Sequence, residues 1–231
     1  MKTTHRLRGR TALTSGLMLS LLWPVLARAD DFQSWTGLFV QQTLDAKTSV
    51  TWRAEPRFTD DASYLGTVFL RAAVARTYNR STKWTADLTY IDARSEDPVT
   101  GDTRHGEQFW VGGGHTSRWW LSEQWGVALR QSLRARWLDG QDSPNIVSRH
   151  YGEVAWRPTR PGYFQGVYAG AEGFVEYAND TRPEYRLTPF GVRLRPTEHT
   201  SLSVFYLIRA RKYGSDWRRA NVIGTYLTWR I

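Results

Sequence analysis

The sequence predicts an all-β fold, a single antiparallel β-barrel of 10 or 12 strands, and three observations lead to that prediction. Residues 124–137 alternate strictly between apolar and polar side chains, which is the period of a β-strand. A short apolar segment near the N-terminus has the composition of a secretory signal. The rest of the chain divides into strand-like segments joined by polar turns, with no linker or low-complexity stretch.

The first element is the secretory signal. Several basic residues precede an apolar run at residues 17–26, which ends in Ala27-Arg28-Ala29. The run is too short to cross a membrane as a helix, and its small residues predict cleavage between Ala29 and Asp30. We therefore predict a signal peptide at residues 1–29 and one barrel domain at residues 30–231.

The signal peptide narrows the location of the protein. The chain has no cysteine that could carry a lipid anchor, and no second apolar run follows the signal. In a Gram-negative cell, these features leave a periplasmic protein or an outer-membrane barrel. The net charge is +9, and it falls to about +4 once the five basic residues of the predicted signal are removed.

Eleven segments are strand candidates because alternating or β-favouring residues lie between turn-forming residues. In the second candidate, the apolar residues Val50 and Trp52 occupy one parity and the charged residues Arg53 and Glu55 the other. In the tenth candidate, apolar residues again occupy one parity, and Arg209 belongs to the other. In chain order the candidates are residues 32–44, 47–58, 64–78, 83–93, 106–117, 123–138, 146–157, 163–177, 185–195, 200–212 and 219–231.

The sixth candidate indicates the outer membrane. Its apolar parity begins at Trp125 and ends at Trp137, whereas its polar parity carries Arg130, Arg134 and Arg136. At roughly 3.3 Å per residue and a tilt of about 40°, the two tryptophans are somewhat under 30 Å apart, close to the apolar band of an outer-membrane barrel. We therefore expect the apolar parity to face lipid and the arginines to face the lumen.

The connectors set the orientation. Longer connectors lie at residues 59–63, 94–105, 139–145, 178–184 and 213–218, and short ones at 79–82, 160–162 and 196–199. With the C-terminus in the periplasm, the long connectors are outer loops and the short ones periplasmic turns. Eleven strands break the usual even number, so either residues 32–44 are not a regular wall strand or one strand is missed or merged.

Four segments carry a resemblance to a known family: Phe32-Gln33-Ser34-Trp35, the segment Trp52–Arg57, Arg134-Ala135-Arg136-Trp137, and the closing residues 221–231. The chain resembles the outer-membrane barrel family catalogued as domain of unknown function 2490 (DUF2490). The resemblance covers nearly the whole mature chain. It implies a β-barrel fold and brings no established activity, so no catalytic residue is carried over.

The face of the strands opposite the apolar face is basic. The residues predicted to face the lumen are Arg53, Arg57, Arg71, Arg130, Arg134, Arg136, Arg193, Arg195, Arg209, Arg211, Glu55, Glu153, Glu172 and Glu176. Two functions fit them: a narrow anion-favouring pore or site for a small anionic solute, or a closed structural barrel filled by an arginine–glutamate ladder. Three glycines at residues 112–114 indicate close approach of lumen side chains.

The aromatic residues and the partners follow from the same orientation. Trp125, Trp137, Trp156, Tyr177 and Trp229 are the predicted membrane girdle. The expected partners are outer-membrane lipids and the barrel-assembly machinery, which recognises the C-terminal strand; its last residue is Ile231, where Phe is most common. The arginines are spread along strands, which disfavours nucleic-acid binding. No cofactor and no metal site are predicted.

Two alternatives remain. An outer-membrane lipid or lipid A hydrolase needs a serine, a histidine and an orienting group; Ser148 and His150 share the lipid-facing parity, but Glu153, Glu172 and Glu176 do not, so we expect no enzyme. A soluble periplasmic ligand-binding β-protein would need its apolar faces inward and its arginines outward.

Overall fold

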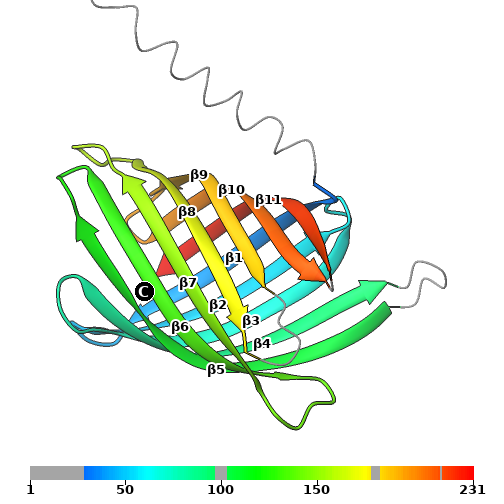
Figure 1. The fold of residues 1–231 in the computed structure, drawn as a ribbon. Helices are drawn as coiled ribbons and strands as arrows, with labels where there is room; N and C mark the ends of the chain where they lie inside the picture. The colour runs from blue at the N-terminus through cyan, green and yellow to red at the C-terminus, as the bar shows by residue number, and fades with distance from the viewer. Residues whose placement is uncertain (1–28, 97–102, 178–182, 214) are drawn as a thin grey trace, which may run out of the picture.

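A computed structural model describes residues 29–96, 103–177, 183–213 and 215–231, and within them eleven strands close into one barrel (Figure 1). The strands are β1 (Asp31–Thr43), β2 (Thr48–Thr59), β3 (Tyr64–Thr77), β4 (Thr82–Glu96), β5 (Thr103–Trp120), β6 (Trp125–Leu138), β7 (Asn145–Trp156), β8 (Phe164–Glu176), β9 (Glu184–Leu194), β10 (Thr200–Tyr213) and β11 (Asp216–Arg230).

The predicted number of 10 or 12 strands is wrong, because the barrel has eleven among the described residues. Consecutive strands pair antiparallel, so an odd number leaves β1 and β11 running in the same direction. They close the barrel as a parallel pair, in register from Asp31 opposite Ala220 to Gln41 opposite Arg230. Residues 32–44 are therefore a regular wall strand, and the sheet is mixed rather than purely antiparallel.

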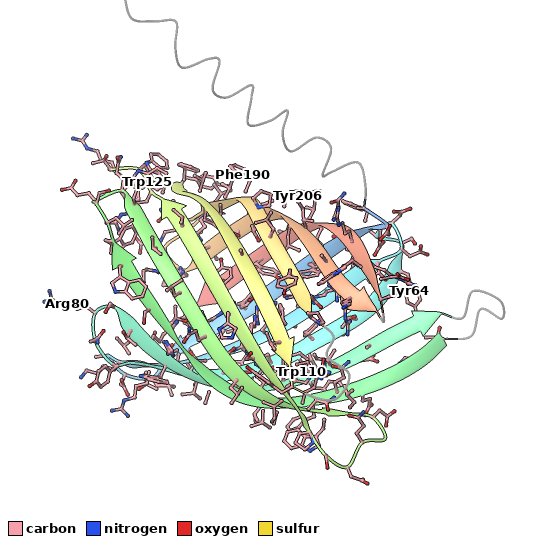
Figure 2. All side chains as sticks on the ribbon, viewed as in Figure 1. Tyr64, Arg80, Trp110, Trp125, Phe190 and Tyr206 are labelled. Carbon is pink, nitrogen blue, oxygen red and sulfur yellow. The ribbon has the colours of Figure 1, made fainter. Side chains whose placement is uncertain are left out.

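The two ends of the barrel differ. We call the end where β1, β3, β5, β7 and β9 finish the turn end, and the opposite end the loop end. Figure 2 shows Arg80 and Trp125 at the turn end and Tyr64 at the loop end. The hairpin of β4 and β5 is longer than predicted, because pairing continues to Glu96 opposite Thr103.

The outer face of the wall is apolar. Leu38, Leu70, Leu88, Leu133 and Leu227 are all exposed, although alternating strands of a water-soluble sheet bury such residues. Charged residues such as Arg53, Arg134 and Glu172 lie on the inner face, and this is the reverse of the arrangement that a soluble ligand-binding barrel requires. None of the described residues forms a helix long and apolar enough to cross a membrane.

Apolar packing fills part of the interior. Trp35, Phe205, Leu207 and Val222 form a buried cluster on β1, β10 and β11. Glycines opposite large inward side chains make this packing possible: a Cβ on Gly224 would lie 2.0 Å from the Phe205 ring.

Two of the three glycines at residues 112–114 have the predicted role, whereas a Cβ on Gly113 would meet only backbone atoms of β4, with the Thr85 carbonyl oxygen at 3.1 Å. A Cβ on Gly112 would lie 2.3 Å from Cγ of Arg134, and one on Gly114 would lie 2.6 Å from Cβ of Ser132. Both glycines therefore leave room for side chains of β6.

The described residues include only the last residue of the predicted signal peptide. Residues 1–28 of the predicted signal peptide lie outside the described residues. Of the predicted cleavage pair, Ala29 is half-buried and Asp30 is exposed. The Asp30 backbone amide donates to the carbonyl oxygen of Arg219 at 2.9 Å, so the pairing of the chain with β11 begins at this residue.

Candidate functional site

A cavity of about 910 Å³ occupies the barrel interior. Its lining includes Thr59 and Arg211 near the loop end and Arg195 and Arg230 near the turn end. It therefore extends along most of the barrel. All ten arginines that the sequence assigns to the lumen line it: Arg53, Arg57, Arg71, Arg130, Arg134, Arg136, Arg193, Arg195, Arg209 and Arg211.

The four glutamates assigned to the lumen are also inside. Glu153, Glu172 and Glu176 line the cavity. Glu55 is fully buried, where it accepts hydrogen bonds from Arg53 and, at 2.6 Å, from Nε of Arg57. Burial of a carboxylate is tolerated only when it is paired and hydrogen-bonded, so Glu55 fixes both arginines against the wall.

Sequence reasoning missed seven charged residues of the lumen: Lys83, Asp87, Arg118, Arg149, Glu184, Arg186 and Arg230. Asp87 and Arg149 share the inward parity of their strands, so the alternation alone would have found them.

Arg186 is different, because β9 carries an irregularity in its pairing with β10 between Leu187 and Phe190. Thr188 and Pro189 of β9 there oppose the single residue Leu207 of β10, so the inward parity changes along the strand. Counting back from Arg193 would place Arg186 outside.

Glu172 on β8 is the centre of the largest ion-pair group. Arg130 of β6 donates to it at 3.0 Å, Arg186 of β9 at 3.4 Å, and Arg149 of β7 through Nε. Four strands thus meet at one buried carboxylate.

Asp87 on β4 forms the second group. The Asp87 carboxylate accepts a hydrogen bond from Arg71 at 2.8 Å. It accepts two more from Nε and one Nη atom of Arg134, at 3.1 and 3.2 Å. This fork geometry is the strong, oriented form of an arginine–carboxylate pair.

The remaining carboxylates pair in the same manner. Glu184 accepts from Arg186 at 2.6 Å and from two nitrogens of Arg209 at 3.0 Å. Glu153 accepts from Arg193 and from the Tyr151 hydroxyl, both at 2.6 Å. The Arg136 guanidinium donates to Glu176. The inner wall therefore carries an arginine–carboxylate ladder built of several separate ion-pair groups.

The ladder is strongly basic. Among the described residues, its carboxylates are Glu55, Asp87, Glu153, Glu172, Glu176 and Glu184, and eleven arginines pair with these six. The cavity is also lined by Lys83, Arg118, Arg195 and Arg230. A surplus of positive charge in a confined space with low-dielectric walls concentrates anions and repels cations.

Aromatic rings hold several of these arginines. The guanidinium of Arg57 lies between the rings of Trp35 and Phe69, 3.7 and 3.9 Å from their centroids. That of Arg186 lies 4.5 Å from the Phe174 ring and 5.1 Å from Trp35. Because β9 and β1 are not neighbours in the barrel, the contact of Arg186 with Trp35 narrows the lumen.

The predicted girdle residues lie at both ends of the wall. Trp125, Tyr177 and Trp229 are exposed. Trp137 and Trp156 are half-buried and their rings pack against Phe109 and Phe164, respectively, with centroids 6.3 Å apart. Trp125, Trp156 and Trp229 belong to the turn end, and Trp137 and Tyr177 to the loop end.

Ser148 and His150 differ in exposure, although the sequence places both on the lipid-facing parity. His150 is exposed, but Ser148 is buried. The Ser148 hydroxyl lies 3.3 Å from Nε2 of His150 and 3.2 Å from the Tyr177 hydroxyl. None of the described carboxylates contacts the imidazole, and the part of the chain that the structure describes holds no group of three or more His, Asp or Glu suited to a metal ion.

Comparison with known proteins gives the family but no activity. No curated protein matches the chain. A family model described as a protein of unknown function, DUF2490, matches residues 32–220, which run from the start of β1 into β11. With the barrel and its basic lumen assembled from these same residues, the chain belongs to the DUF2490 family.

Proposed function

We propose that this protein is an outer-membrane β-barrel that provides a narrow, anion-favouring path for small solutes. The observation that carries the proposal is the cavity lining, in which arginines outnumber carboxylates from one end of the barrel to the other. Rings of positive charge lower the barrier for anions in a pore.

The location rests on the outer face of the wall. Leucines and other large apolar side chains are exposed on it, and in water such a continuous apolar surface would drive aggregation. The exposed Trp125 and Trp229 belong to one end and Tyr177 to the other, as in the aromatic girdles of outer-membrane barrels. On this proposal, the turn end faces the periplasm and lipid surrounds the wall.

The path is narrow. A volume of about 910 Å³, spread over an apolar band of about 25 Å, gives a mean cross-section of about 36 Å². This section admits a few water molecules side by side. We expect such a path to pass inorganic ions and small organic acids and to exclude bulky solutes.

The test is single-channel conductance of the refolded protein in a planar bilayer across a KCl gradient. We expect small discrete steps with a reversal potential of anion-selective sign. Replacing Arg118 and Arg195 with glutamine removes two charges that line the turn end and leaves the ladder intact, so the reversal potential should move toward zero. The control is Lys47→Gln, in the exposed turn between β1 and β2.

The result that overturns the pore is a correctly folded barrel, shifted by heating on a gel, that gives no steps or selects cations. A silent barrel would favour the closed structural role, in which the ladder serves only to fill and stiffen the interior.

A second candidate, hydrolysis of an outer-membrane lipid, is favoured by one observation, the 3.3 Å contact between Ser148 and His150. Serine activation by histidine needs such a contact. Turnover of an acyl ester in mixed micelles that is abolished by Ser148→Ala would support it, and equal turnover by the two proteins would exclude it.

A further inference from the structure

A second, smaller cavity of about 170 Å³ opens beside the main one, against the inner wall of β2–β6. Arg53, Arg71, Lys83, Arg130 and Arg134 line it, with Asp87 as its carboxylate. It lies toward the turn end, where the inward side chains of β3 and β5 include Ala73, Ala75 and Gly114. These small residues leave a recess between long basic side chains, which we call the side pocket.

Hydrogen-bond donors in the side pocket lack partners. The Nε atoms of Arg53, Arg71 and Arg130 and the hydroxyl of Ser132 are buried without a hydrogen bond, and all four residues line the pocket. Buried polar groups are otherwise almost always satisfied, and leaving them unmet is costly. These four residues border one recess, so small side-chain movements would turn the unpartnered donors toward a ligand with several acceptor oxygens.

The charge of the side pocket selects the sign of the ligand. Asp87 is already committed to Arg71 and Arg134, and Arg53 and Arg130 pair with glutamates on their other side. Among the described residues, Lys83 has no ion-pair partner. Of the five cations that line the pocket, four pair with three carboxylates, Asp87 inside it and Glu55 and Glu172 outside it, so the pocket keeps a positive charge that favours an anion.

We propose that the side pocket binds a tetrahedral oxyanion, namely inorganic phosphate or the phosphate group of a small monoester. The side chains that carry these donors belong to β2, β3 and β6, so they border the pocket from more than one strand. A planar carboxylate offers two oxygens in one plane, whereas phosphate offers acceptors all round, and guanidinium groups match it closely. A space of about 170 Å³ holds roughly five water molecules, enough for such a group.

The inference rests on the proposed function in one respect, because the anion has to enter from the lumen. The side pocket shares Arg53, Arg71 and Lys83 with the main cavity, so the two adjoin across these side chains. Binding would place the oxyanion beside the path.

The test is isothermal titration of the refolded full-length protein in detergent micelles with inorganic phosphate in a low-chloride buffer. We expect one phosphate per barrel. Lys83→Gln should weaken binding about tenfold, because one charge-assisted hydrogen bond is lost, and Ser132→Ala should weaken it several-fold. Lys47→Gln makes the same charge change away from both cavities and should bind as the wild type does.

The competing anions identify the ligand. Displacement of phosphate by glycerol 3-phosphate supports a monoester site, and displacement by sulfate alone supports a site for free oxyanions. Acetate binding as tightly as phosphate, or unchanged phosphate affinity in both Lys83→Gln and Ser132→Ala, would overturn the inference. A barrel that binds phosphate but stays silent in the bilayer contradicts only the pore, and one that conducts anions without binding phosphate contradicts only the side pocket.

Discussion

Replacing Glu172 with glutamine should be among the most damaging single changes to the ladder. The carboxylate is 8% exposed and accepts hydrogen bonds from Arg130, Arg149 and Arg186. Glutamine has the same size, so the change leaves no cavity. What it removes is the negative charge shared by three guanidinium groups.

The magnitude follows from how exposed each partner is. The Arg130 side chain is 37% exposed to the lumen, so solvent screens its pair and its share is small. The Arg186 contact is long, at 3.4 Å, and Arg186 keeps Glu184 as a second partner. Most of the loss therefore comes from Arg149 and from burying cations without compensation, which costs about 3–5 kcal/mol.

The assay is reversible urea unfolding of the barrel in micelles, followed by tryptophan fluorescence, because eleven of the twelve tryptophans lie in the barrel domain. We expect the free energy of unfolding to fall by about 3–5 kcal/mol, with Glu123→Gln, in an exposed turn, within about 0.5 kcal/mol of the wild type. A loss below about 1 kcal/mol would refute the reasoning, because it would place Glu172 in effectively bulk solvent. In the bilayer the same variant should select anions more strongly, since the lumen loses a negative charge.

Three further changes test other parts of the fold. Gly224→Ala should lower the free energy of unfolding by about 1–3 kcal/mol through overpacking, because the new Cβ meets the Phe205 ring at 2.0 Å; Phe205→Leu should restore part of it, and a neutral Gly224→Ala would show that the interior is loosely packed. Ala62 has a φ of 61°, so Ala62→Gly should raise the same free energy by about 1 kcal/mol, whereas Ala46→Gly, without a positive φ, should not; equal effects would disprove the strain. Hydrogen bonds from the backbone amides of its turn hold the pKa of Asp45 below its usual value. The stability that Asp45 contributes is therefore present above about pH 4 and lost as the pH falls through the lowered pKa. The difference in urea midpoint between the wild type and Asp45→Ala should shrink at low pH, and a difference that stays constant would contradict this assignment.

Local patterns predicted the faces of the strands well, because side-chain direction in a strand depends only on parity. Every arginine assigned to the lumen, from Arg53 to Arg211, lines the interior. The failure at Arg186 has a local cause. The pairing of β9 with β10 shifts around Pro189, so parity does not carry through this part of the strand. The burial of Ser148 was missed because the Tyr177 hydroxyl that contacts it comes from beyond the end of a neighbouring strand.

The sequence by itself determined that this chain alternates apolar and basic faces over strands of about the observed lengths, because that information lies within a few neighbouring residues. Only the tertiary structure decided that eleven strands close through the parallel pair of β1 and β11. It also decided which carboxylate each arginine meets, and that unpaired donors gather around the side pocket. Closure and pairing depend on the register between residues far apart in the chain, such as Arg134 and Asp87, and no pattern within a single strand contains that register.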